Sequence, residues 1–262
     1  MEAIVTLNPL YSLAGVLVGL LVGLTGVGGG SLMTPLLVLA FGFHPATAVG
    51  TDLLYASVTK TVGTTVHGWR GTVDWRVVGR LALGSVPAAL LSLLMLSHMG
   101  ERTGEAGHLM ATLLGATLLV TAIATLFRQR LVGWLVARLG TAEGARLTLL
   151  TAALGAVLGV LVSLTSVGAG ALGMTALLVL YPRHALKSLV GSDIAHAVPL
   201  TLLAGIGHWL LGSVDLSLLA SLLLGSIPGI IVGSLLASTV KEGVLRPILA
   251  VTLLLVGVKL LV

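Results

Sequence analysis

The chain has 262 residues, of which 56% are hydrophobic and only 9% are charged. A soluble domain carries roughly a quarter charged residues, so this composition excludes a soluble globular protein and indicates an integral membrane protein. Cysteine is absent, which excludes disulfides, cysteine-ligated zinc and thiol chemistry. The formal net charge of +5 reflects arginines in the loops. We expect it to reflect orientation in the lipid bilayer and not nucleic-acid binding.

Ten apolar segments follow one another along the chain in two sets of five. They span 10–24, 31–42, 49–66, 77–97 and 109–127, and then 147–164, 171–181, 189–210, 216–237 and 244–262. The first two of each set are short: about 15 and 12 residues in the first set, or roughly 22 and 18 Å of helix. Neither comfortably crosses a hydrocarbon core of ~30 Å. Each short pair therefore predicts a re-entrant hairpin, or alternatively one broken span, and the other segments predict full spans.

A glycine-rich break separates the two short segments in each set. The first reads Leu-Thr-Gly-Val-Gly-Gly-Gly-Ser over 24–31, and the second reads Leu-Thr-Ser-Val-Gly-Ala-Gly-Ala over 164–171. Each glycine disfavours a helix by about 1 kcal/mol relative to alanine. Irregular backbone at membrane depth persists only where protein or a water-filled cavity surrounds it. Matching breaks in two halves are typical of a transporter with its site at the breaks.

Five landmarks, the break included, recur in one order about 140 residues apart, which indicates a duplication. The other four pair Gly50-Thr51-Asp52 with Gly191-Ser192-Asp193, His67 with His208, Asp74 with Asp215, and Gly84-Ser85-Val86-Pro87 with Gly225-Ser226-Ile227-Pro228. Glycines also recur at four-residue spacing, a pattern that predicts close helix packing in lipid. These are Gly15, Gly19 and Gly23, and Gly225, Gly229 and Gly233.

Arginine placement predicts how the repeats are oriented. The connector 128–146 carries four arginines, so it should be cytoplasmic by the positive-inside rule. Three spans per repeat leave the outer loops with one Arg and no Lys, whereas four spans would place several basic residues outside. We therefore predict an all-α polytopic membrane protein of two inverted repeats with both termini outside. Each repeat is a re-entrant hairpin plus three spanning helices, residues 1–127 and 147–262.

The two breaks should meet near the midplane, each at the start of a helix. Unpaired N–H groups and the positive end of the helix dipole form a site for an anion there. The candidate substrate-binding residues are Thr25, Gly28, Gly29, Gly30 and Ser31 in the first break and Thr165, Ser166, Gly168 and Gly170 in the second. Alternatively, the glycines only allow a tight turn. No Lys-Ser/Thr follows at P-loop spacing, so neither a nucleotide nor another cofactor is expected, and no metal site is predicted.

Asp52, Asp193 and Lys60 are the charged residues of the apolar segments that we consider for a role in transport. Asp52 and Asp193 open the third segment of each set, so they are either helix N-caps or carriers of a coupling ion. Lys60 lies in the interior of segment 49–66 and pairs either with an anionic substrate or with a structural partner such as Asp52 or a carbonyl.

Several neighbouring polar residues complete this prediction. Thr51 and Ser192 are candidate substrate ligands beside the aspartates. His196 is a further coupling candidate, which either pairs with Asp193 across one turn or makes a structural hydrogen bond. We expect His67 and His208 to lie at the membrane interfaces.

The breaks, Pro35, Gly50-Thr51-Asp52 and Gly191-Ser192-Asp193 resemble the sulfite exporter TauE/SafE family over nearly the whole chain. The resemblance implies a transporter of sulfite or a small organosulfur anion across a bacterial inner membrane. Export needs little coupling because an inside-negative potential favours it, whereas uptake would need H⁺ or Na⁺. The alternatives are an intramembrane hydrolase, with Ser31 and either His44 or His67 as base, and a non-transporting membrane subunit. A homodimer remains open as the assembly.

Overall fold

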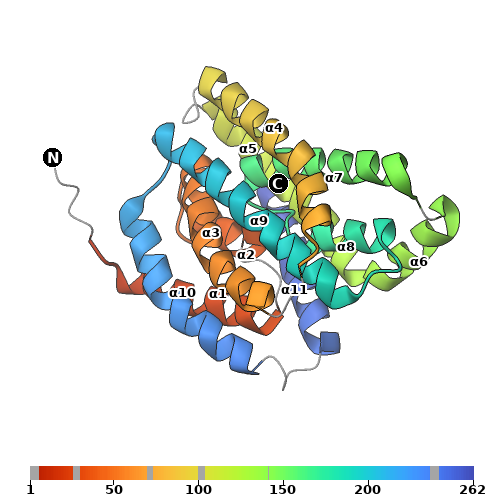
Figure 1. The fold of residues 1–262 in the computed structure, drawn as a ribbon. Helices are drawn as coiled ribbons and strands as arrows, with labels where there is room; N and C mark the ends of the chain where they lie inside the picture. Colours follow the sequence, from red (N-terminus) through yellow and green to blue (C-terminus); the bar gives the residue numbers. More distant parts are fainter. Residues whose placement is uncertain (1–5, 26–29, 70–72, 100–103, 141, 237–241) are drawn as a thin grey trace.

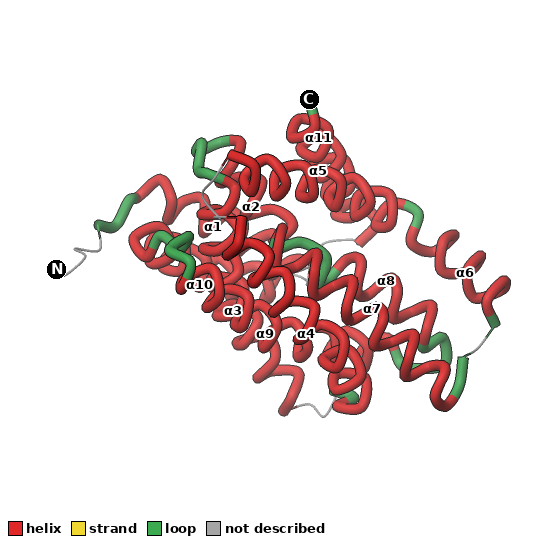
Figure 2. Tube along the Cα trace, turned by 90° about the horizontal axis from the view of Figure 1, so that it is seen from above, coloured by secondary structure: helices red, strands yellow, loops and turns green. Residues whose placement is uncertain are grey.

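The computed structural model describes residues 6–25, 30–69, 73–99, 104–140, 142–236 and 242–262. Over these residues it contains eleven α-helices and no strand (Figure 1; Figure 2). In chain order they are α1 (Pro9–Thr25), α2 (Gly30–Leu39), α3 (Pro45–Trp69), α4 (Trp75–Met99), α5 (Gly104–Leu126), α6 (Arg128–Leu139), α7 (Gly144–Thr165), α8 (Ala171–Leu180), α9 (Leu186–Leu210), α10 (Leu216–Leu236) and α11 (Glu242–Leu261).

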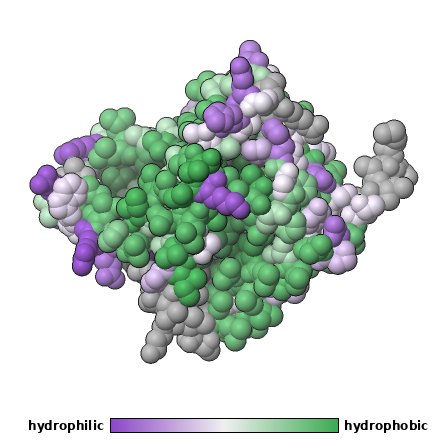
Figure 3. Space-filling view, turned by 180° about the vertical axis from the view of Figure 1, so that it is seen from behind, coloured by the Kyte–Doolittle hydropathy of each residue, from purple (hydrophilic) through white to green (hydrophobic). Residues whose placement is uncertain are grey.

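Five of these helices are long and apolar enough to cross a bilayer: α4, α5, α7, α9 and the 216–233 part of α10. Large apolar side chains also cover much of the outer surface, as Figure 3 shows over the face seen from behind. An apolar surface of this extent matches a lipid solvent and not water. The chain is therefore an all-helical, multi-pass membrane protein.

Each of the ten predicted apolar segments contains a helix, with two differences. Helix α6 lies inside the predicted connector and stands at the edge of the molecule in both Figure 1 and Figure 2. Helix α7 has 22 residues, so it is longer than its predicted segment and long enough by itself to span. Helices α2 and α8 have ten residues each, roughly 15 Å, which is too short to cross.

Contacts at their ends show that α1–α2 and α7–α8 are hairpins. Tyr11, in the first turn of α1, packs edge-on against Phe41 just after α2, with ring centroids 5.1 Å apart. Glu143, just before α7, accepts a hydrogen bond of 3.2 Å from Arg183, which follows α8. In each hairpin, the start of the first helix therefore lies beside the end of the second helix.

The two halves of the chain pack through matching pairs of helices. Helix α1 packs against α10, and α7 packs against α4 (Figure 1). Glycine allows the close approach: a Cβ on Gly15 would lie 2.3 Å from the carbonyl oxygen of Leu222, and one on Gly225 would lie 1.8 Å from that of Ser12. The prediction of close packing is thereby confirmed, and the two predicted glycine faces turn out to be each other's partners. Gly155 makes the equivalent approach to Leu81.

Two equivalent hydrogen bonds fix how the halves are oriented. The Asp74 N–H, just before α4, donates to Ser192 Oγ near the start of α9 at 2.8 Å. The Asp215 N–H, just before α10, donates to Thr51 Oγ1 near the start of α3 at 3.1 Å. Helix α4 thus starts beside the start of α9. Because α4 follows α3 after a short loop, the end of α3 also lies near the start of α9. Helices α3 and α9, which pack together at the centre, therefore run antiparallel.

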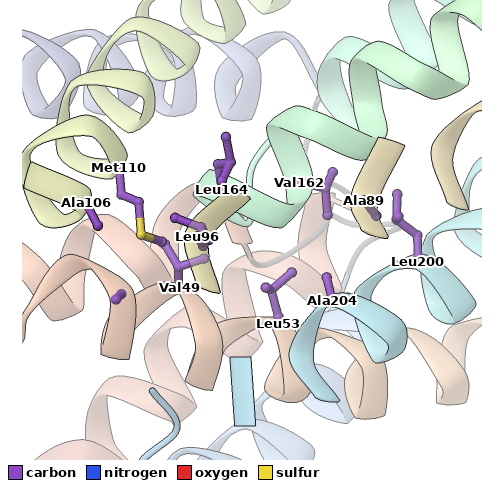
Figure 4. Close-up of a cluster of buried hydrophobic side chains, with 11 residues drawn as sticks. Val49, Leu53, Ala89, Leu96, Ala106, Met110, Val162, Leu164, Leu200 and Ala204 are labelled. Atoms are coloured by element: carbon purple, nitrogen blue, oxygen red, sulfur yellow. The ribbon is translucent and has the colours of Figure 1, made fainter. Parts of the chain in front are cut away.

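A buried apolar cluster, to which α3 and α9 both contribute, joins the two halves of the chain. Figure 4 shows side chains from α3, α4, α5, α7 and α9 pointing toward one another. Its members include Val49, Leu53, Ala89, Leu96, Met110, Val162, Leu164, Leu200 and Ala204. The polar side chains on α3 and α9 are consequently held in a packed interior.

Candidate functional site

The second glycine-rich break has an irregular backbone that only a few residue types adopt. Ser166 has a φ of 58°, and Gly168 and Gly170 have φ of 123° and 124°. A side chain at either glycine would be strained, so the glycines are needed for the shape of this turn. In the first break, Gly28 and Gly29 lie outside the described residues, as does the side chain of Thr25. Gly30 begins α2, and Ser31 is buried in its first turn.

The break itself already satisfies part of the first turn of α8. The Gly173 N–H donates to the Gly168 carbonyl and the Met174 N–H to the Gly170 carbonyl, both at 3.0 Å. A helix start offers four N–H groups without a partner inside the helix. These two bonds leave the N–H groups of Ala171 and Leu172 as the donors that an anion at this helix start would use.

Three of the predicted substrate hydroxyls are engaged in local structure. Thr165 Oγ1 donates to the Leu161 carbonyl at 2.6 Å and accepts the Val167 N–H at 3.1 Å, which closes the end of α7. Thr51 and Ser192 accept the backbone N–H groups that precede α10 and α4. These hydroxyls therefore hold helix ends in place.

Both aspartates lie inside helices, so the N-cap hypothesis is wrong. Helices α3 and α9 begin at Pro45 and Leu186, seven residues before Asp52 and Asp193 respectively. A proline at the first helical position suits the start of α3, since it has no N–H to satisfy. Asp52 and Asp193 are instead 0% and 4% exposed and face the protein interior.

Each carboxylate lies at the start of the short helix of its own half. Thr34, on α2, donates its hydroxyl proton to Asp52 Oδ2. Asp193 Oδ1 faces α8, where a Cβ added to Gly173 would lie only 2.7 Å from it. The positive end of a helix dipole stabilises an anion at such a place. The chain's own carboxylates thus lie where the sequence predicts a bound anion.

One oxygen of each carboxylate makes no hydrogen bond within the described residues: Oδ1 of Asp52 and Oδ1 of Asp193. Ser166 of the second break faces Asp52, and the Ser166 hydroxyl likewise makes no hydrogen bond there. A buried polar group without a partner costs about 1–3 kcal/mol. Such groups are rare in folded proteins, so these two oxygens at equivalent positions are acceptors that a proton or a ligand could use.

Among the described residues, Lys60 is a cation that interacts electrostatically with both acids. It is partly buried, and it interacts electrostatically with Asp193 most strongly and with Asp52 more weakly. Within the described part of the chain, the ion pairs closer than 4 Å join Arg183 to Glu143 and His184 to Asp74. Lys60 therefore acts on the carboxylates at longer range. Asp52, Lys60 and Asp193 are called the interior cluster below.

The structure decides between the two accounts of His196 and corrects the prediction for His208. His196 does not pair with Asp193: its Nε2 is 2.8 Å from Ser85 Oγ on α4, so the structural hydrogen bond is the right account. His208 is not at an interface, because it is fully buried with its Nε2 2.8 Å from the Ser163 carbonyl. The side chain of His67 lies outside the described residues.

Two partners of the interior cluster were missed from the sequence. Thr34 aligns with Thr175 when the one-residue slip between the repeats is placed inside the breaks, and this alignment would have singled it out. Arg128 was assigned to the connector by charge alone, yet it interacts electrostatically with Asp193. Nothing in the local sequence distinguishes it from Arg130.

Comparison with known proteins decides the family. Residues 11–260 match the family described as sulfite exporter TauE/SafE. The chain belongs to the TauE/SafE family. One member, the probable membrane transporter protein YjnA of Bacillus subtilis (strain 168), is 41% identical over 255 residues, which cover 95% of this chain and 98% of YjnA.

Two shorter matches agree with this assignment to the TauE/SafE family. The probable membrane transporter protein YunE of Bacillus subtilis is 42% identical over 72 residues, covering 28% of this chain and 25% of YunE. A probable membrane transporter protein of Xylella fastidiosa (strain Temecula1) is 38% identical over 91 residues, covering 34% of this chain and 35% of that protein. No solved structure matches the chain significantly. This TauE/SafE member is therefore a membrane transporter and not an enzyme.

Proposed function

We propose that this transporter moves small sulfur-containing anions, with export of sulfite or an organosulfonate across the bacterial inner membrane as the leading case. The family description names sulfite export, and the similar proteins named above come from bacteria. The substrate class is carried to this chain from the family, and the interior of the protein supplies the physical argument for it.

The interior cluster is the observation that carries the proposal. It consists of two buried carboxylates, each with one oxygen that no described residue hydrogen-bonds, and a partly buried lysine that interacts with an acid from each half of the chain. Ionisable groups within membrane segments are costly and mark ion or substrate pathways. A site built from both halves suits alternating access, in which one half rocks against the other around a central site.

Charge balance indicates how an anion would enter. Lys60 and Arg128 supply two positive charges, and Asp52 and Asp193 supply two negative charges when both are ionised. The arrangement is then neutral, and the Asp193 carboxylate already faces the first turn of α8. An anion beside Lys60 would bind best after one carboxylate takes up a proton. Asp52 and Asp193 are therefore the proposed coupling residues, whereas His196 is tied to Ser85 and has a supporting role.

The proposed substrate contacts follow from this geometry. Lys60 supplies the charge and Ser166 a hydroxyl, while Gly168 and Gly170 shape the turn that presents the first N–H groups of α8. By repeat equivalence, Gly28, Gly29, Gly30 and Ser31 would form the other wall, with Thr25 beside them. Thr51, Thr165 and Ser192 would support the site through the helix ends that they hold.

We further propose that residues 1–127 and 147–262 are inverted repeats, joined by a cytoplasmic connector over 128–146, with re-entrant hairpins α1–α2 and α7–α8. The antiparallel packing of α3 and α9 and the matching α1–α10 and α7–α4 pairs support this topology. Export would be favoured by an inside-negative potential, by about 2.3 kcal/mol per charge per 100 mV. The protonatable carboxylates favour one alternative, which is uptake of a small anion coupled to H⁺.

Ligand-induced stabilisation of the purified protein tests the substrate class. A ligand that binds only the folded state raises the melting temperature, and at equal concentration a tighter ligand raises it more. We expect sulfite and sulfoacetate to raise it more than acetate at equal concentration and ionic strength, and proton uptake to accompany binding in weakly buffered solution. Stabilisation by acetate alone, or by none of sulfite, sulfate, thiosulfate and sulfoacetate, would exclude the proposed substrates.

A further inference from the structure

A pocket of about 470 Å³ lies where α5 meets α6, and no member of the interior cluster lines it. Its lining residues are Thr125, Leu126, Phe127, Arg128, Gln129, Arg130 and Pro247. The volume is in the range of ligand pockets, which leaves room for an oxyanion with its hydration water or for an organosulfonate.

The lining of this pocket has the chemistry of an oxyanion site. It contains two guanidinium groups and no carboxylate. Arginine presents its N–H donors in a planar fork that matches two oxygens of one oxyanion. The Thr125 hydroxyl on the same wall is buried and makes no hydrogen bond within the described residues. A hydroxyl in that state offers a further donor to a ligand in the pocket.

Arg128 connects this pocket to the interior. It is the first residue of α6, which packs against α8, and it is partly exposed on the pocket side. Asp193, which faces the first turn of α8, interacts electrostatically with Arg128 as well as with Lys60. One cation therefore borders the open pocket and influences the buried acid.

We propose that the pocket at the α5–α6 junction is the vestibule on the connector side, where Arg128 and Arg130 hold the transported oxyanion before it enters the interior cluster. An anion bound there draws Arg128 away from Asp193, which makes protonation of Asp193 easier and opens the place beside Lys60. The inference rests on the proposed function, since it assigns the vestibule to the same sulfur-containing anion.

The phosphate of an anionic lipid has the same chemistry as a free oxyanion, so the test must separate the two sources. Sulfite flux is measured in proteoliposomes of pure phosphatidylcholine and in matched vesicles that also contain phosphatidylglycerol. The variants are Arg130→Gln, Arg128→Gln/Arg130→Gln, and Arg128→Lys/Arg130→Lys, which keeps charge but loses the fork. Arg138→Gln is the matched control, because Arg138 lies on α6 over Trp134 and not in the pocket.

We expect the double glutamine variant to raise the KM for sulfite about tenfold in pure phosphatidylcholine, the loss typical of charge-assisted hydrogen bonds. The maximal rate and melting temperature of Arg130→Gln should stay close to those of the unaltered protein, and Arg138→Gln should change nothing. Arg130→Gln alone should raise the KM by a smaller factor. The KM of Arg128→Lys/Arg130→Lys should lie between those of the unaltered protein and the double glutamine variant.

Three results would overturn the vestibule alone. They are an unchanged KM in the double variant, an equal rise in Arg138→Gln, and an effect that requires phosphatidylglycerol, which would assign the pocket to lipid. A double variant that fails to fold leaves the decision to Arg130→Gln, since Arg130 is exposed. Absence of sulfite flux in the unaltered protein would overturn the proposed function and the vestibule together.

Discussion

Replacing Gly173 by alanine tests whether the position of the Asp193 carboxylate matters for transport. The added Cβ would lie 2.7 Å from Asp193 Oδ1 and 3.3 Å from Leu158 Cδ1, whereas ordinary contact begins at 3.4 Å. The carboxylate must therefore retreat from α8 by about 0.7 Å. A misplacement of ~1 Å at a preorganised site costs up to ~100-fold in rate, so we expect sulfite flux to fall at least about tenfold.

The same change should leave the protein folded. Overpacking costs about 1–3 kcal/mol, and alanine regains up to ~1 kcal/mol of helix propensity in α8. The net loss of up to ~2 kcal/mol corresponds to a melting temperature lower by at most roughly 8 °C for a chain of this size. Flux in proteoliposomes and melting temperature are measured on the same preparation.

Gly79→Ala is the matched control, because Gly79 is a helical glycine on α4 with no atom within 4 Å of an added Cβ. It should melt at the same or a slightly higher temperature and transport normally. Unaltered flux in Gly173→Ala, or an equal loss in Gly79→Ala, would show that the carboxylate beside α8 has no part in transport.

Three further predictions concern topology, the second break and Lys60. Single cysteines at positions 2 and 262 should both react with an impermeant reagent in intact cells, and labelling of only one, or only after permeabilisation, would rule out inverted repeats. Gly170→Ala, at a φ of 124°, should lose both flux and stability. Gly42→Ala, at a φ of 69° in a loop with no atom within 4 Å of the new Cβ, should lose only stability. Equal flux in both variants would show that the second break takes no part in transport. Lys60→Met should lower the free energy of unfolding by less than the roughly 3–5 kcal/mol that losing a close buried partner costs, and the melting temperature should fall with it. Asp193→Asn in the same background should restore part of this loss. An unchanged melting temperature in Lys60→Met would mean that Lys60 does not stabilise the carboxylates.

The helices could be predicted because their signals are local. Apolar length and repeated landmarks placed ten of the eleven helices, and the four-residue glycine spacing identified the faces of α1 and α10 that pack together. Helix α6 was missed because its apolar stretch is short: residues 131–137 lie between Arg130 and Arg138, which is far less than a membrane span. The starts of α3 and α9 were placed several residues late, since their first turns are polar or small in character.

The site was harder to predict because it depends on contacts between distant segments. The sequence singled out Asp52, Asp193 and Lys60 as polar residues in apolar surroundings, and the structure brings them into one interior cluster. It gave no sign that Ser166 faces Asp52 or that Arg128 influences Asp193. Thr51 and Ser192 each precede an aspartate in the sequence, which suggested a shared role. Adjacent residues of a helix point in different directions, and these two hydroxyls instead bind the starts of α10 and α4.

The central claim is that a sulfur oxyanion crosses the protein beside Lys60, and efflux of radiolabelled sulfite from proteoliposomes tests it most directly. Vesicles are loaded with the label, an inside-negative potential is imposed, and the unaltered protein is compared with Lys60→Met/Asp193→Asn and with protein-free vesicles. The double variant lacks both the Lys60 ammonium and the Asp193 carboxylate, with which that ammonium interacts most strongly. We predict rapid efflux for the unaltered protein and, for a double variant that is folded by its melting temperature, efflux close to that of protein-free vesicles. Efflux from the unaltered protein no faster than from protein-free vesicles, or equal efflux from the unaltered protein and the double variant, would contradict the claim.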